Sequence, residues 1–295
     1  MANFTAALLD RPAVQSAATV ALAYLDDAAA AAARLDDRTD ADALHDFRVA
    51  LRRLRVTVRA YPGVHESVPK KQRSKLRKLA RSTNAARDAE VQIAWFRDRS
   101  ARFTPTERAA LGPLRARLRA RRRKALTDTH RAVPERFGKL ERKLRRHLTE
   151  LQSRAGGHEA PFRVVAVGTL VQHVAELGSR LRSASPSSAP AELHATRIAA
   201  KRLRYLLEPV RSGMPNGNRL VQRLKDLQDL LGALTDAHEL ELVLADGGAD
   251  ATTATNLLRA EVAALFTKLR DEWSTAGTAR RRRSRRGLVR DLASG

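Results

Sequence analysis

A short run of residues, rich in histidine and arginine, occurs twice in this chain of 295 residues. The first copy spaces one histidine and three arginines at intervals of three or four residues: His45, Arg48, Arg52 and Arg55. At the angular step of a helix, about 100° per residue, these side chains lie on one stripe, and Arg59 extends it by a turn. A guanidinium group suits phosphate oxygens because its planar fork donates two parallel hydrogen bonds. The spacing therefore predicts a row of phosphate-binding side chains on one helix face.

The second copy lies about half the chain later and repeats the charged pattern as His194, Arg197, Lys201 and Arg204. Its row is shorter, because Glu208 stands where the first copy has Arg59. A single charge run is most often a solvated face. A face that only contacts water could, however, carry Lys, Glu or Gln equally well at these positions. Like charges one helical turn apart also repel each other by a few tenths of a kcal/mol. The duplication therefore indicates that an anion relieves the repulsion in both copies.

A second pattern recurs after each copy. It pairs Lys71 and Lys75 with Arg219 and Arg223, and it ends on an Asp-Ala pair at Asp88 and Asp236. On a helix, Lys71, Lys75, Lys78 and Arg81 form one basic stripe. We therefore add Lys71, Lys75, Lys78, Arg219 and Arg223 to the predicted phosphate-binding residues.

Composition narrows the class of ligand and of chemistry. The net charge is +24 and the isoelectric point about 11.5, which attracts polyanions such as nucleic acid, acidic membrane surfaces and inorganic polyphosphate. The absence of cysteine excludes disulfides, thiolate zinc sites and cysteine nucleophiles. The sequence contains no glycine-rich phosphate loop, and the acidic stretch around Asp36 to Asp46 is interpreted as helix capping. We therefore predict no metal site, no cofactor and no catalytic residue.

The sequence has few stretches in which apolar and polar residues alternate as in a strand, and only 4% of its residues are aromatic. Both features favour an all-helical fold. We predict helices over residues 12–35, a repeat helix that ends near Pro62, and helices over 69–99 and 105–154, the last interrupted at Pro134. In the second half we predict helices over 161–182, 191–211, 218–244 and 251–276. The chain then divides into an N-terminal half at 12–155, a C-terminal half at 158–277 and a basic, disordered tail at 278–295.

The run Leu-His-x-x-Arg-[Val/Ile]-Ala-x-[Arg/Lys]-Arg-Leu-Arg resembles the hallmark of the CHAD family, the conserved histidine α-helical domain. The later Arg87-Asp88-Ala89-Glu90-Val91 and Leu231–Asp236 are similar to its second motif. The resemblance implies an all-α fold, in which two pseudo-symmetric four-helix bundles form one CHAD domain with a central basic cavity or groove. It also implies binding of inorganic polyphosphate by the eight residues of the two stripes, and association with polyphosphate granules. Arg53 and Arg202 match the motif but lie off the stripes.

Two other functions remain open. A nucleic-acid-binding protein would explain the charge, although no aromatic stripe accompanies the basic residues as base stacking requires. An enzyme of polyphosphate metabolism would require metal-binding carboxylates beside the stripes, and the sequence offers no such set. No signal peptide or membrane span is visible, so a cytoplasmic protein is expected. The Glu-x-Glu-x-Lys signature of the CYTH domain, fused to some CHAD domains, is absent, which predicts a stand-alone CHAD protein of unknown oligomeric state.

Overall fold

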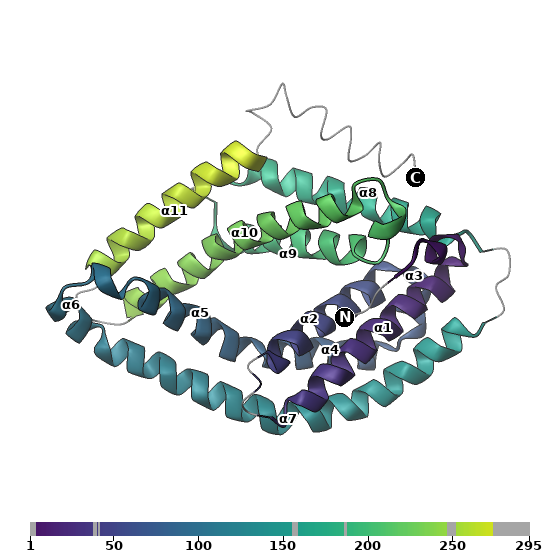
Figure 1. Cartoon of the computed structure of the whole chain (residues 1–295), viewed down its shortest axis with the longest axis horizontal. Helices are drawn as coiled ribbons and strands as arrows, with labels where there is room; N and C mark the ends of the chain where they lie inside the picture. The colour runs from purple at the N-terminus through teal and green to yellow at the C-terminus, as the bar shows by residue number, and fades with distance from the viewer. Residues whose placement is uncertain are drawn as a thin grey trace.

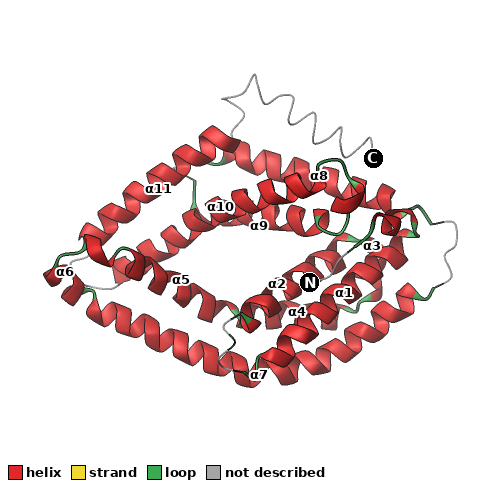
Figure 2. Ribbon diagram, viewed as in Figure 1, coloured by secondary structure: helices red, strands yellow, loops and turns green. Residues whose placement is uncertain are grey.

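The computed structural model describes residues 4–37, 40, 42–154, 159–185, 188–246 and 252–273. Within these ranges every regular element is a helix, as predicted, and no strand occurs (Figure 2). The tail at 278–295 and the junction at Gly156-Gly157 lie outside the described residues.

The described residues of the first half form seven α-helices. They are α1 (Ala13–Arg34), α2 (Ala43–Ala60), α3 (Pro62–Ser67), α4 (Lys70–Ser82), α5 (Asn84–Asp98), α6 (Pro105–Ala110) and α7 (Gly112–Gln152). The second half contains α8 (Phe162–Ser183), α9 (Pro190–Leu207), α10 (Gly217–Asp246) and α11 (Thr252–Trp273). Short 3₁₀ turns accompany them at Ala6–Asp10, Ser100–Arg102 and Arg211–Gly213.

The helix predicted over 69–99 is in fact two helices, because the chain turns at Thr83. This residue is buried and ends α4, and its hydroxyl donates to the carbonyl of Ala80 at 2.9 Å. The hydroxyl of Ser82 likewise donates to the carbonyl of Leu79 at 2.8 Å. Such side-chain bonds compete with the helical backbone pattern. The prediction of one continuous helix was wrong here because two local hydroxyls favour a break.

The helix predicted over residues 105–154 is also two helices in the structure, α6 and α7. Thr104 and Glu107 form a reciprocal capping box that starts α6. This helix ends at Ala110, and α7 begins at Gly112 after Leu111. By contrast, α7 continues through Pro134, where an interruption was predicted. Figure 1 shows α7 bent near its middle along the lower edge of the molecule. A proline removes one backbone donor and kinks a helix, and here it bends α7 without ending it.

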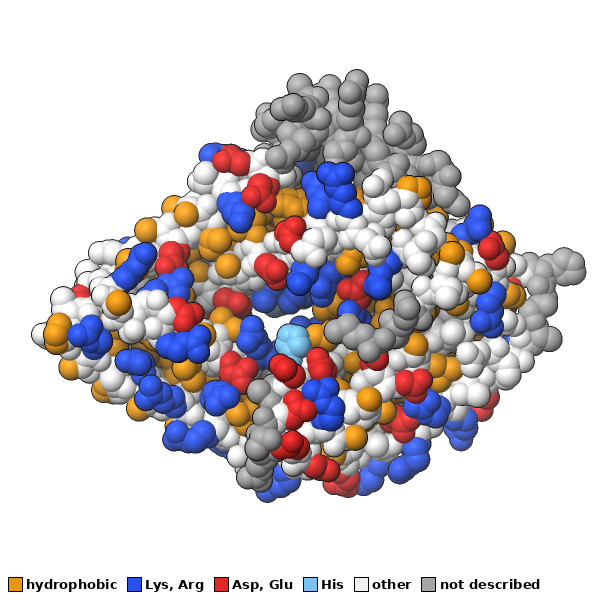
Figure 3. All heavy atoms as spheres, viewed as in Figure 1, with side chains coloured by type: hydrophobic (Ala, Val, Ile, Leu, Met, Phe, Trp, Pro, Cys, Tyr) orange, Lys and Arg blue, Asp and Glu red, His pale blue; other side chains and the backbone are white. Residues whose placement is uncertain are grey.

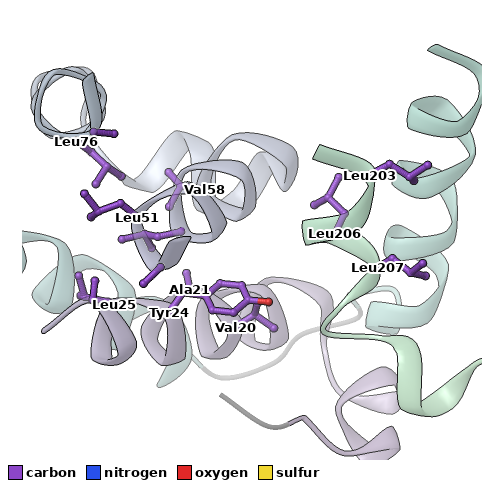
Figure 4. Close-up of a cluster of buried hydrophobic side chains, with 14 of the residues drawn as sticks. Val20, Ala21, Tyr24, Leu25, Leu51, Val58, Leu76, Leu203, Leu206 and Leu207 are labelled. Carbon is purple, nitrogen blue, oxygen red and sulfur yellow. The ribbon is translucent and has the colours of Figure 1, made fainter. Parts of the chain in front are cut away.

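The main hydrophobic core extends across both halves of the chain. Helix α1 packs against α2 and α7, and α9 packs between α8 and α10. The two groups meet where α2 contacts α9 and α1 contacts α8. Figure 4 shows buried side chains of the first group opposite Leu203, Leu206 and Leu207 of α9. The rings of Tyr61 and Phe162 add a contact between halves, with centroids 5.2 Å apart.

A second, smaller core lies where α5 and the start of α7 meet α10 and α11. We call it the distal core; it consists of Phe96, Phe103, Leu111, Leu114, Leu118, Ala237, Leu240, Leu244, Ala254 and Leu258. In Figure 1 it lies at the left, far from the contact between α1 and α8. The two halves are therefore joined at two separate places.

Candidate polyanion-binding site

The two basic stripes come from α2 and α9, the helices at which the halves meet. Lys201 on α9 lies close enough to Arg52 on α2 for the two charges to repel. Burial, followed by repulsion from Arg197 and Arg52, lowers the pKa of Lys201 to about 7, although Asp236 opposes the shift. The stripes thus converge on one shared surface, which we call the central surface.

Arg48 on the first stripe is nearly buried, with 7% of its surface exposed. Its Nη2 donates to the Oδ1 of Asn84 at 3.4 Å, and its buried Nε has no hydrogen-bond partner within the described part of the chain. Burial and the charge of Arg52 lower its pKa to about 10, although Asp88 opposes them. An anion at this surface would supply the missing partner.

The second half repeats this arrangement with different partners. Arg197 pairs with Asp236, Nη1 to Oδ1 at 3.4 Å, and its Nε is also buried without a partner. Gly232 occupies the place of Asn84 in the repeat, and a Cβ there would lie 3.3 Å from the Nη2 of Arg197. The glycine lets the guanidinium pack directly against α10.

Arg55 connects the central surface to α4. Burial lowers its pKa, and so do the neighbouring cations Arg81, Arg52, Arg77 and Arg202 in that order. The basic stripe predicted for this helix contains Arg81 but not Arg77. The signal was present, because Arg77 and Arg81 are four residues apart and therefore share a helix face.

The two motif histidines differ in their surroundings. His194 lies near Arg197, Lys201 and Asp88, and burial together with the two cations lowers its pKa. The carboxylate of Asp88 lies across the boundary between halves, so His194 faces the first half. His45 is exposed at the start of α2. Figure 3 shows a hollow at the centre of one face, bordered by a histidine and by blue Lys and Arg side chains.

The structure does not bring all predicted residues to this surface. Lys75 lines a separate hollow between α4 and α7 with Lys139, Arg142, Lys143 and Arg146. Arg223 stacks on the ring of Trp273, 5.2 Å from its centroid, on the α11 side of α10. Lys71, Lys78 and Arg219 are exposed. Arg59 is exposed as well and lies near Arg202 and His173.

Arg53, which matches the motif but lies off the stripe, has a structural environment. Its Nε donates to the Oε2 of Glu208 at 2.7 Å, and the two side chains are 14% and 7% exposed. Its guanidinium also lies over the rings of Tyr24 and Tyr205, at 5.8 and 6.0 Å from their centroids. Glu208, the residue that replaces the fourth cation of the stripe, therefore binds α2 to the end of α9.

Carboxylates lie at one end of the central surface. Asp88 and Asp236 are close enough to repel each other, and Glu239 lies near both. Burial raises the pKa of Asp88, although the charges of Arg48 and Arg121 oppose this shift. Burial and the charges of Asp88 and Asp236 raise the pKa of Glu239.

Among the described residues no group of three or more acidic or histidine side chains is arranged to hold a metal ion. None of the described helices has the length and apolar character needed to cross a bilayer.

Comparison with known proteins agrees with this architecture. The structure superposes on the crystal structure of the CHAD domain from the plant Ricinus communis with a TM-score of 0.67, at 21% identity, over 98% of this chain and 96% of that one. It also superposes on PptA from Streptomyces chartreusis with a TM-score of 0.51, at 16% identity, over 99% and 100% of the chains. At these identities the likeness concerns the fold. No curated protein matches the chain. The sequence model of the CHAD domain matches residues 19–245, so the chain belongs to the CHAD family.

Proposed function

We propose that this CHAD protein binds inorganic polyphosphate along the central surface. The stripe residues of α2 and α9 would contact the phosphate oxygens, with Arg77 and Arg81 of α4 extending the surface beyond Arg55. The ligand is a flexible polymer with a charge on each phosphate, so it can follow a row of cations that span two helices. Association with polyphosphate granules, expected from the family, is part of the proposal.

The observation that carries the proposal is the crowding of half-buried cations without enough counter-charge. Arg48 and Arg197 each have a buried Nε with no hydrogen-bond partner in the described residues. The Nε of Arg204 is also buried without a hydrogen bond, but it lies 3.6 Å from the Oε1 of Glu208, so this cation has a counter-charge. Lys201 has a pKa of about 7 because burial and neighbouring cations disfavour its charge. Buried unpaired donors are costly, so an occupant that is both anionic and rich in acceptor oxygens fits this surface best.

The arrangement of aromatic residues favours polyphosphate over single-stranded nucleic acid. Tyr24 and Tyr205 are buried beside Arg53, and Trp95 packs edge-on against Phe96, with ring centroids 5.2 Å apart. Base stacking uses aromatic faces that line the basic groove. Polyphosphate has no bases and needs only the cations.

A competition experiment tests the proposal. Long-chain polyphosphate and duplex DNA would be titrated at matched salt against the wild type and against a central variant with Arg48→Gln, Arg52→Gln, Arg197→Gln and Lys201→Gln. The matched control removes four exposed cations elsewhere, Arg97→Gln, Arg102→Gln, Arg182→Gln and Lys268→Gln. We expect the central variant to lose at least tenfold in polyphosphate affinity, and the control to lose less than threefold.

Two results would contradict the proposal. Equal losses in the central and control variants would assign binding to net charge alone. Tighter binding of duplex DNA than of polyphosphate by the wild type would favour a nucleic-acid function.

Two further experiments address the basic tail and catalysis. A variant truncated after residue 277 tests whether the basic tail carries the binding. A phosphate-release assay with magnesium tests the expected lack of catalysis, and sustained turnover would refute it.

A further inference from the structure

Helix α4 has a basic side chain at each edge of its exposed face. Its buried face consists of Leu76, Leu79 and Ala80. At one edge Arg77 and Arg81 lie near Arg55 and so belong to the central surface. On the helical wheel Lys75 lies about 160° from Arg77, and it faces α7 at the opposite edge.

The hollow beside Lys75, about 330 Å³ in volume, is lined by cations only. We call it the outer groove; its residues are Lys75, Lys139, Arg142, Lys143 and Arg146. Two of the cations have carboxylate neighbours on α7 itself: Glu135 lies 2.5 Å from Lys139, and Glu150 lies 3.9 Å from Arg146. All four side chains are more than 60% exposed, and such pairs contribute little. The other three cations have no ion pair with a described residue, so the groove retains an excess of positive charge.

Exposed cations also connect the outer groove to the central surface. Lys78 lies about 60° from Lys75 and about 60° from Arg81 on the wheel of α4, and it is exposed. The row Lys75, Lys78, Arg81 therefore crosses the open face of α4 from one surface to the other. A flexible polyanion can follow this row without crossing an apolar strip.

The corresponding place in the second half differs. Arg223 matches Lys75 in the repeat, but its guanidinium is stacked on Trp273 of α11. Asp229 stands where the first half has Arg81. A basic path of this kind is therefore built into the first half of the repeat and not into the second.

We propose that the outer groove is a second phosphate-binding site, and that one long polyphosphate chain occupies the central surface, crosses α4 and enters this groove. The inference rests on the proposed function for its ligand. A short oligophosphate fills only one of the two sites. Linking two sites through one ligand raises the apparent affinity without any new contact at either, so the protein selects long chains over short ones.

The test compares chain lengths. A groove variant, Arg142→Gln, Lys143→Gln and Arg146→Gln, changes three exposed side chains, and its control is Arg102→Gln, Arg182→Gln and Lys268→Gln. Isothermal titration would use tripolyphosphate and long-chain polyphosphate at several salt concentrations. For the long chain we expect at least a tenfold loss in the groove variant. We also expect the plot of log affinity against log salt concentration to be shallower by about 2. Each lost phosphate contact reduces this slope by about 0.7, by analogy with single-stranded nucleic acid, and the variant loses three cations. Tripolyphosphate affinity should stay within threefold.

Several outcomes would overturn the inference. One is an equal affinity of the groove variant and its control for long-chain polyphosphate. Another is a wild type that binds tripolyphosphate as tightly as the long chain. A groove variant that loses affinity for duplex DNA while keeping its polyphosphate affinity would assign the groove to nucleic acid.

Failure of the proposed function has a different signature. In that case the central variant would keep wild-type affinity for both phosphate ligands, whatever the groove variant does. Circular dichroism of each variant would establish that its helical content is retained.

Discussion

At the scale of single residues, the central surface consists of cations held where their charge is unfavourable. Lys201 is half-buried, and Arg197, Arg204, Arg52 and Asp236 surround it from three helices. Burial, and then the net effect of these charges, lowers the pKa of Lys201 to about 7, so about half of the amine is neutral at neutral pH. A bound anion would complement these charges, as the proposed function requires.

Polyphosphate binding should therefore take up protons around neutral pH. The pKa of Lys201 is about 7 in the free protein, and a bound anion raises it. Above pH 7 the amine must gain a proton on binding, so affinity should fall as the pH rises from about 7 to 9. Titration calorimetry in two buffers of different ionisation enthalpy measures the uptake.

The variant Lys201→Arg provides the control, because a guanidinium stays protonated throughout this range. It should bind with a much weaker pH dependence above pH 7. His194, whose pKa is lowered by burial, Arg197 and Lys201, contributes at lower pH, where it gains its proton more readily once the anion is bound. An unchanged pH profile in Lys201→Arg would refute the assignment to Lys201.

At the scale of secondary-structure elements, an ion pair determines how α2 and α9 meet. Arg53 and Glu208 lie 2.7 Å apart, with 14% and 7% of their side chains exposed. Burial favours the neutral guanidinium, but the Glu208 carboxylate and its hydrogen bond raise the pKa of Arg53 above its usual value. The pair thus keeps both charges and positions the two stripes relative to each other.

Glu208→Gln should destabilise the protein by about 3 kcal/mol, since removing one partner leaves a buried charge unpaired. Urea unfolding followed by circular dichroism measures the loss. The double variant Arg53→Gln/Glu208→Gln should recover part of it. As a control, Asp128→Asn breaks the exposed pair with Lys124 and should cost less than about 1 kcal/mol. Similar losses at the two sites would contradict the structural role of Glu208.

Pro134 imposes a cost on α7 that an alanine would remove. A proline inside a helix costs about 3 kcal/mol relative to alanine, and part of this is offset by the smaller entropy of the unfolded chain. We expect Pro134→Ala to raise the free energy of unfolding by roughly 1–2 kcal/mol, measured in urea. A loss of stability would instead mean that the packing of α7 along α1 and α5 requires the bend.

At the scale of the whole molecule, two separate contacts between the halves enclose the central hollow. The main core joins them where α2 meets α9, and the distal core joins them where α5 and α7 meet α10 and α11. The position of the stripes therefore depends on packing at both contacts, and not only on the residues of the central surface.

Weakening the distal core should affect binding as well as stability. Leu240 is 1% exposed in this core, and Leu240→Ala should cost about 2–5 kcal/mol. We also expect a several-fold loss of polyphosphate affinity below the unfolding temperature, because the halves are then joined less firmly. Leu242→Ala, two residues away and 70% exposed, should change stability by less than about 0.5 kcal/mol. Wild-type affinity in Leu240→Ala would show that the central surface is independent of the distal core.

The sequence alone determined the features that depend on helical periodicity. The spacing of His45, Arg48, Arg52 and Arg55 determines that they share a face, because each helical residue advances by about 100°. The all-α fold and the CHAD family were predicted from such local patterns and are confirmed. The domain bounds, the pairing into two four-helix bundles and the phosphate-binding role of the residues stay predictions.

The tertiary structure decided what each face meets. Nothing near Lys75 in the sequence indicates that it faces α7 while Arg77 lies near Arg55, and the pair of Arg53 with Glu208 joins residues from opposite halves. The break at Thr83 and the continuity at Pro134 were also missed, because hydroxyl bonds and helix packing outweigh average preferences there. Contacts of this kind depend on how distant helices pack, and local spacing contains no information about that packing.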